Sequence, residues 1–191
     1  MFTLALLALA ATSLAAPTPT SPEDLSSTTA VTSIITHTVV AALGGSLSFS
    51  PDNVQAEIGD VVEWHFLAAN HTVAQSNFAD PCVPLDDEYS SSSLSSASPS
   101  GFFPGFEFAT APGTQAANVF QITITDTNPI WYYCPQATHC QAGMSGVINQ
   151  GFEEGDATLA EYKRNSVGSV TVIPDEVVGE VIANPNPLGG F

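Results

Sequence analysis

The sequence predicts an all-β fold, in which two sheets of short strands form a sandwich with Greek-key connections. Short runs with the alternation of apolar and polar residues that is typical of strands recur along the chain, and residues that favour turns separate them. Almost no segment shows the apolar period of an amphipathic helix. The 191 residues are enough for one domain with a hydrophobic core and additional segments at both ends.

The chain begins with a predicted secretory signal peptide at residues 1–16. This stretch contains no charged side chain, is dominated by Leu and Ala, and ends in small residues before Pro17. It is too short to span a membrane. Residues 17–33 follow as a leader rich in Ser, Thr and Pro without a hydrophobic period, so we expect them to be disordered. The expected localisation is therefore secreted and extracellular, and the Ser-rich segments favour association with a cell wall or cell surface.

The predicted β-domain occupies residues 34–150. Its candidate strands are residues 33–41, 46–50, 54–58, 61–67, 71–75, 119–126, 129–133 and 145–149. A long connection runs from residue 78 to residue 108 and contains a Ser-rich insertion at residues 90–100. A loop of this length in a compact domain usually carries function or is partly disordered.

Residues 151–191 are expected to form a disordered acidic tail outside the core. Residues 157–163 have a composition that allows one or two helical turns, and the apolar residues that follow fit either short strands or unstructured chain. The last residues contain no hydrophobic stretch of the kind that a GPI-anchor signal requires, so no such anchor is expected. No apolar run has the length of a transmembrane helix, so no transmembrane segment is expected either.

The chain is strongly acidic. It has 19 Asp and Glu residues against only Lys163 and Arg164, which gives a formal net charge of −17. We expect no binding to nucleic acid, because such binding requires Lys and Arg to neutralise phosphates, and the same reasoning argues against anionic membrane surfaces. Two explanations of the acidity remain open: attraction of basic partners or cations, and life in acidic surroundings where many carboxylates are protonated.

Residues 134–144 carry the pattern that predicts a function. Cys134, His139 and Met144 follow one another at intervals of five residues, directly after an apolar strand. A loop that leaves a strand in this way allows its side chains to converge on one point, and His71 offers a further donor from the end of another strand. Two imidazoles and a thiolate in a trigonal set, with a weak axial thioether, are the ligands of a blue-copper electron-transfer site. Soft sulfur ligands favour copper over zinc.

These residues, with Asn70 and Cys82 around them, resemble the cupredoxins. The chain looks closest to plant phytocyanins and to secreted serine-rich cupredoxin-like proteins of fungi, and the resemblance covers residues 36–149. It implies a β-sandwich of the cupredoxin type that binds one copper ion, Cu(I) or Cu(II), through His71, Cys134, His139 and Met144, and that contains a Cys82–Cys140 disulfide. The Ser-rich insertion, the acidic tail and the Ser145-Gly146 pair after the axial Met depart from the family's pattern.

The cysteine count is odd, since the chain has three cysteines and an oxidising compartment favours pairing. The pairing implied by the resemblance, Cys82 with Cys140, leaves Cys134 for a metal. A Cys134–Cys140 disulfide with Cys82 free remains an alternative at this point, although it would remove the thiolate from the predicted site.

Asn70, next to a predicted ligand, is expected to hydrogen-bond near the Cys134 loop and so to support the site. It also begins the N-glycosylation motif Asn70-His71-Thr72. A glycan at this point would crowd a formed metal site, so we favour the supporting role. His37 and His65 are predicted to be structural, because no other metal ligand is near them in the sequence.

The predicted function is one-electron transfer by a secreted mononuclear blue copper protein that is not an enzyme. The chain has four His and no His-x-His pair, so it lacks the additional copper cluster of the multicopper oxidases. It also lacks the Gly-x-Ser-x-Gly motif of serine hydrolases. The alternative is a copper-sequestering or structural protein of the cell wall or surface without redox turnover. The redox partner is unknown, and the acidity of the chain favours a basic one.

Overall fold

The structure is a computed structural model that describes residues 33–85, 101–153, 155 and 157–189. The predicted signal peptide, all but the last residue of the leader, and the Ser-rich insertion lie outside the described residues. The described part of the chain contains ten strands, one α-helix and one short 3-10 helix, η1 (Leu43–Gly45). No helix of this part has the length and apolar character needed to cross a bilayer.

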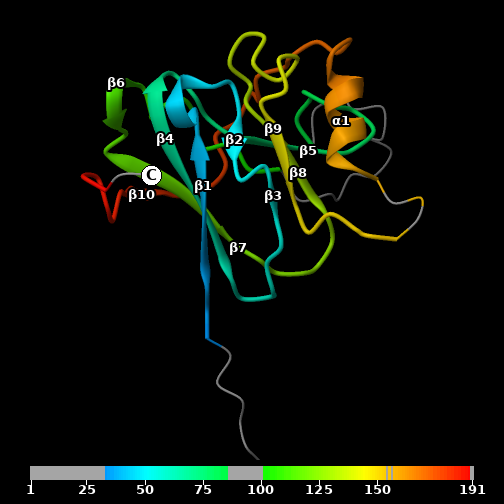
Figure 1. Ribbon diagram of the computed structural model, residues 1–191, viewed down its shortest axis with the longest axis horizontal. Helices are drawn as coiled ribbons and strands as arrows, with labels where there is room; N and C mark the ends of the chain where they lie inside the picture. Colours follow the sequence, from blue (N-terminus) through cyan, green and yellow to red (C-terminus); the bar gives the residue numbers. More distant parts are fainter. Residues whose placement is uncertain (1–32, 86–100, 154, 156, 190–191) are drawn as a thin grey trace, which may run out of the picture. The chain divides into compact units, whose positions relative to one another are not determined.

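The larger of two sheets has six strands. They are β1 (Thr36–Ala41), β2 (Phe49–Ser50), β4 (Val61–Ala69), β6 (Thr110–Gln115), β7 (Asn118–Thr123) and β10 (Val181–Ala183). Their order is β10-β7-β4-β1-β2, with β6 paired to β4 off this path (Figure 1). The β1 and β4 strands run parallel, and the other pairs are antiparallel.

The smaller sheet has four strands. They are β3 (Asn53–Val54), β9 (Ser145–Ile148), β8 (Ile130–Tyr133) and β5 (Ala74–Ser76), in that order across the sheet. The β3–β9 pair is parallel and the remaining pairs are antiparallel. Two mixed sheets and one short helix confirm the predicted all-β class.

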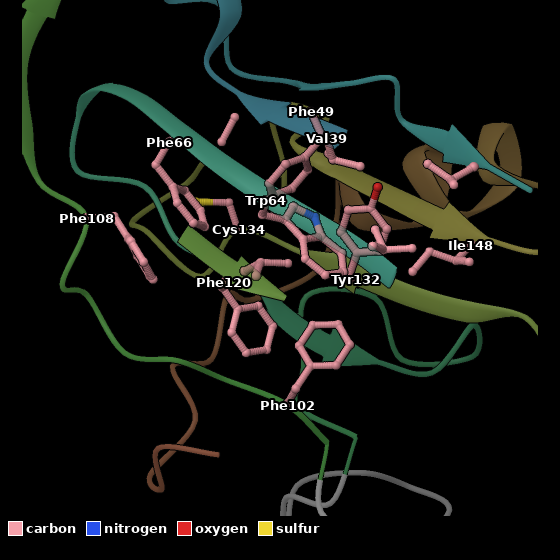
Figure 2. Packing of buried hydrophobic residues seen from close by; sticks show 14 of the residues in the cluster. Val39, Phe49, Trp64, Phe66, Phe102, Phe108, Phe120, Tyr132, Cys134 and Ile148 are labelled. Atoms are coloured by element: carbon pink, nitrogen blue, oxygen red, sulfur yellow. The ribbon is translucent and has the colours of Figure 1, made fainter. Parts of the chain in front are cut away.

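The hydrophobic core contains side chains from both sheets (Figure 2). In β4, Val62, Trp64 and Phe66 are almost completely buried in it, because alternate residues of a strand point to the same face. The Trp64 ring lies 5.7 Å from the Phe120 ring and 5.3 Å from the Tyr132 ring, centroid to centroid. Aromatic side chains from both sheets thus meet at the centre of the core.

The chain after residue 150 packs on both sheets, which differs from the expectation of a tail outside the core. Helix α1 (Leu159–Ser166) buries Leu159 and Tyr162 against Trp131 of β8 and Val147 of β9. The Tyr162 and Trp131 rings stack with their centroids 5.4 Å apart and an interplanar angle of 7°. Figure 1 shows α1 next to β9.

The local sequence explains this helix. The Thr158 hydroxyl accepts a hydrogen bond from the Glu161 N–H and so caps the first turn. Leu159 and Tyr162, three residues apart, then lie on one face of the helix. Trp131 points away from the core because its neighbour Tyr132 points into it, and α1 covers its apolar ring. The domain boundary at residue 150 stays a prediction.

Candidate metal centre

The predicted ligands come from two separate parts of the fold. His71 follows the end of β4, whereas Cys134, His139 and Met144 lie on the loop between β8 and β9. This ligand loop, residues 134–144, is closed by hydrogen bonds between its own residues. The Cys134 N–H donates to the Met144 carbonyl at 3.0 Å, and the Met144 N–H donates to the His139 carbonyl at 2.9 Å. These backbone bonds link the positions of the three predicted ligands of the loop.

Three of the four predicted ligands meet at one point. The donor atoms of His71, Cys134 and His139 all lie within 4.8 Å of one another. The Cys134 Sγ and His139 Nδ1 atoms are 3.5 Å apart, and the two imidazole centroids are 4.9 Å apart. Met144 is fully buried in the same apolar cluster as Cys134. The fold thus brings together side chains from distant parts of the sequence, since His71 and His139 are 68 positions apart.

His71 has the surroundings of a metal ligand. Its Nδ1 atom is buried and has no hydrogen-bond partner among the described residues. Burial, followed by the charge of His139, lowers the pKa of His71 from 6.5 to about 4, and burial also lowers the pKa of His139. Both rings are therefore neutral near pH 7 and offer lone pairs. A buried nitrogen without a partner is unfavourable, and a metal ion would satisfy it.

Cys134 is a buried thiol that is suited to a metal rather than to free reactivity. Burial raises its pKa from 9.0 to about 11, against the opposing effect of backbone N–H groups of Thr72 and Gln136. The thiolate is the form that binds metal, so binding of a cation would release the proton of the thiol. The two N–H donors would then stabilise charge on the sulfur. One thiol and two neutral imidazoles form a donor set that fits a soft metal ion, and the thioether of Met144 is predicted to add a second sulfur.

The disulfide joins Cys82 to Cys140, with a Cα–Cα distance of 5.8 Å, and Cys134 is the free cysteine. This confirms the Cys82–Cys140 pairing, and the alternative Cys134–Cys140 pairing is wrong. Because Cys140 directly follows His139, the disulfide ties a ligand position to the connection after β5.

Asn70 contacts the ligand loop from the end of β4. Its Nδ2 atom donates to Gln136 Oε1 at 3.4 Å, and its Oδ1 atom is buried without a partner among the described residues. The contact lies where the sequence predicts it, and its influence on the metal stays a prediction.

Thr72 is a residue of this site that sequence reasoning did not single out. It is fully buried, its N–H faces the Cys134 sulfur, and its hydroxyl donates to the Gly105 carbonyl at 2.5 Å. It thereby links the sulfur to the segment that precedes β6. The feature of the sequence that could have identified Thr72 is its position directly after the predicted ligand His71.

The two other histidines have carboxylate partners. The His37 Nε2 atom lies 2.8 Å from Asp60 Oδ2, and the His65 Nε2 atom lies 2.6 Å from Glu63 Oε1. These contacts agree with the structural roles expected for both residues.

Comparison with known proteins identifies two similar proteins of Arthroderma benhamiae. One is described as "Probable GPI-anchored cupredoxin-1" and is 29% identical over 131 residues, which cover 69% of this chain and 59% of that protein. The other is described as "Extracellular serine-rich protein" and is 34% identical over 119 residues, which cover 62% of this chain and 40% of that protein. The chain thus spans less than two thirds of the length of either relative. No family model matches the chain.

Among solved structures, a mutant plastocyanin of fern aligns with 59% of this chain and 97% of its own, at 19% identity and a TM-score of 0.37. A purple cupredoxin from Nitrosopumilus maritimus aligns with 59% of this chain and 96% of its own, at 14% identity and a TM-score of 0.35. The two sequence relatives confirm the resemblance that the sequence indicates: the chain is similar to proteins named as cupredoxins and as serine-rich extracellular proteins.

Proposed function

We propose that this protein is a secreted mononuclear blue copper protein that carries single electrons. His71, Cys134 and His139 would hold the ion, and the thioether of Met144 would be a further donor. The observation that carries this proposal is the buried, unpartnered Nδ1 of His71, within 4.8 Å of the donor atoms of Cys134 and His139. Copper bound by such a set exchanges one electron between Cu(II) and Cu(I).

The protein's own part in this function is to keep the donors in place. The hydrogen bonds inside the ligand loop and the Cys82–Cys140 disulfide restrain the loop on two sides. The N–H groups of Thr72 and Gln136 face the sulfur and would stabilise its negative charge. A site that is already arranged before the metal arrives needs little rearrangement when its charge changes.

The edge of the site supports contact with a redox partner. His139 is partly exposed, and its neighbours Ala137, Thr138 and Ala142 are exposed. The ligand loop contains no Asp, Glu, Lys or Arg. A partner could thus approach the imidazole over an uncharged surface, while the net charge of −17 would attract a basic partner from a distance.

Secretion and surface location are part of the proposal. They are supported by the predicted signal peptide at residues 1–16 and by the names of the two relatives, one GPI-anchored and one extracellular. That the protein is not an enzyme stays a prediction from the sequence.

The test is the visible absorption spectrum of the protein loaded with Cu(II), compared with those of Cys134→Ser and His37→Gln. We expect an intense thiolate-to-copper band in the red part of the spectrum for the wild type and for His37→Gln, and no such band for Cys134→Ser. Circular dichroism of each variant checks that the fold is intact. A colourless wild-type copper complex would indicate sequestration by other ligands, and absence of binding would leave a purely structural role.

A further inference from the structure

Helix α1 and the segment that follows it hydrogen-bond to the ligand loop. We call residues 159–172 the C-terminal clamp. The side chain of Gln141 uses both ends of its amide here: its Nε2 donates to the Ser169 carbonyl at 3.0 Å, and its Oε1 accepts from the Thr171 hydroxyl at 2.7 Å. The Ser166 hydroxyl donates to the Cys140 carbonyl at 3.3 Å. The clamp therefore hydrogen-bonds to the part of the ligand loop between His139 and Met144.

The clamp also binds both cysteines of the disulfide and the residue before Cys134. The Val172 N–H donates to the Cys82 carbonyl at 2.9 Å, and the Cys82 N–H donates to the Tyr162 hydroxyl at 3.3 Å. The Tyr133 hydroxyl donates to the Val172 carbonyl at 2.7 Å. Residues next to two predicted ligands, Cys134 and His139, are thus fixed from outside the loop.

The beginning of the clamp is anchored on the smaller sheet. Tyr162 is fully buried and its hydroxyl lies 2.7 Å from the Ser76 hydroxyl. Lys163 Nζ lies 2.6 Å from Asp52 Oδ2 in the turn between β2 and β3. The helix is therefore a fixed support for the chain that follows it.

The later part of the clamp is held mainly by polar contacts. Val167 and Val170 are 70% and 67% exposed, so their burial contributes little to docking. Hydrogen bonds to the ligand loop and to Cys82 are what keep this part in place. Removal of these bonds should therefore loosen the loop without disturbing the core.

We propose that the C-terminal clamp is a positioning element of the metal centre and that Gln141 is its main contact with the ligand loop. The clamp holds the loop in its ligand-binding conformation before any metal is bound. This inference rests on the proposed function, because it assigns the clamp a role in a copper site.

The test uses Gln141→Leu, which leaves an apolar side chain of similar bulk and loses both hydrogen bonds. The matched control is Gln55→Leu. Gln55 also donates a side-chain hydrogen bond to the backbone, from its Nε2 atom to the Gln150 carbonyl at 3.3 Å, but this bond lies beyond β9 and outside the ligand loop. We expect amide hydrogen exchange in residues 136–144 of the metal-free protein to become about tenfold faster in Gln141→Leu, and the affinity for Cu(I) to fall about tenfold. Gln55→Leu should change neither.

A second variant tests whether the clamp acts on the ligand loop through the hydrogen bond between Thr171 and Gln141. Thr171→Val should have a smaller effect on exchange in the wild type and none in the Gln141→Leu background, because the Thr171 hydroxyl acts through Gln141. Unchanged exchange in Gln141→Leu would overturn the proposal, and so would faster exchange spread equally over β1 and β4. A wild-type protein that binds no copper would refute the proposed function, while the exchange data would still decide whether the clamp orders the loop.

Discussion

The four histidines of this protein fall into two pairs with opposite surroundings. His37 and His65 each lie within hydrogen-bond distance of a carboxylate, whereas His71 and His139 lie next to each other and to Cys134. In the first pair, the Nε2 atom of each ring contacts a carboxylate of the fold. In the second pair, a buried nitrogen of His71 has no partner among the described residues. The difference separates two histidines that contact carboxylates within the fold from two that the proposed site would use as ligands.

The contrast is sharpest along one strand and its continuation. His65 lies within β4 and is buried between Glu63 on the same strand and Gln115 on β6. Six residues later, after the strand has ended, His71 is just as buried, but its Nδ1 atom has no hydrogen-bond partner in the described part of the chain. Burial alone therefore does not distinguish a structural histidine from a predicted ligand. Among the described residues, the two differ in whether a carboxylate contacts the ring nitrogens.

The largest effect should come from His71→Ala. Loss of support for a ligand already costs about 10–100-fold in metal affinity, so loss of the ligand itself should weaken Cu(I) binding by more than about 100-fold. A competition titration with a Cu(I) chelator measures this. An affinity within a few-fold of the wild type would show that the unpartnered nitrogen is not a ligand.

His65→Leu should give the opposite result. It leaves Glu63 buried without its partner, which should lower the free energy of unfolding by about 3 kcal/mol. Copper affinity should stay the same. Urea denaturation of the metal-free protein, together with the same chelator titration, checks both statements, and a loss of copper binding in a folded variant would break the distinction between the two pairs.

The His37–Asp60 contact should be visible as a pH dependence of stability. The hydrogen bond from His37, followed by those from the N–H groups of Ile35 and Glu57, lowers the pKa of Asp60 below its usual 3.8. A carboxyl whose pKa is lower in the folded state stabilises the fold above the pKa of the unfolded state and loses this contribution as the pH falls through the folded value. Asp60→Asn should therefore be less stable than the wild type at pH 7.

The difference between Asp60→Asn and the wild type should shrink as the pH falls below about 4, because the carboxyl of the unfolded wild type binds a proton there before the folded one does. Urea denaturation of both metal-free proteins at pH 7 and pH 3 measures it. A difference that is constant over this range would mean that the ionised carboxylate contributes nothing through its contacts.

The smallest effect is expected for Asn70→Ala. Its one described contact with the ligand loop is a long hydrogen bond of 3.4 Å, so copper affinity should fall by less than about tenfold. The intact mass of the secreted wild-type protein should show no glycan at Asn70. A glycan there, in a protein that still binds copper, would rule out the supporting role.

Sequence alone predicted the ligand loop because the chemistry lies in a short stretch. Cys134, His139 and Met144 have residue types and spacings that few other structures need. The strand that carries Trp64 was predictable for a similar reason, since its apolar residues alternate with polar ones in the period of a strand.

Two elements depend on contacts with distant residues: α1, which the sequence predicts only in part, and β6, which it does not predict. Helix α1 has only eight residues, and its burial depends on the Trp131 ring, which lies about thirty positions earlier. Strand β6 contains Pro112 and Gly113, both unfavourable in strands, and is mostly exposed. It forms by pairing with the end of β4, across a shift in register. The sequence shows only a weak helical tendency at residues 157–163 and no strand pattern at residues 110–115, so the length and packing of α1 and the existence of β6 could not be predicted from it.

The position of the disulfide has a consequence for how the chain matures. Three cysteines allow three different single disulfides, and only Cys82–Cys140 leaves the thiol of Cys134 unoxidised. Either of the other two would consume the sulfur that the proposed site needs and leave a folded or half-folded chain without it. In an oxidising compartment, the pairing that a chain finally holds would therefore decide whether the sulfur of Cys134 is available to the proposed site.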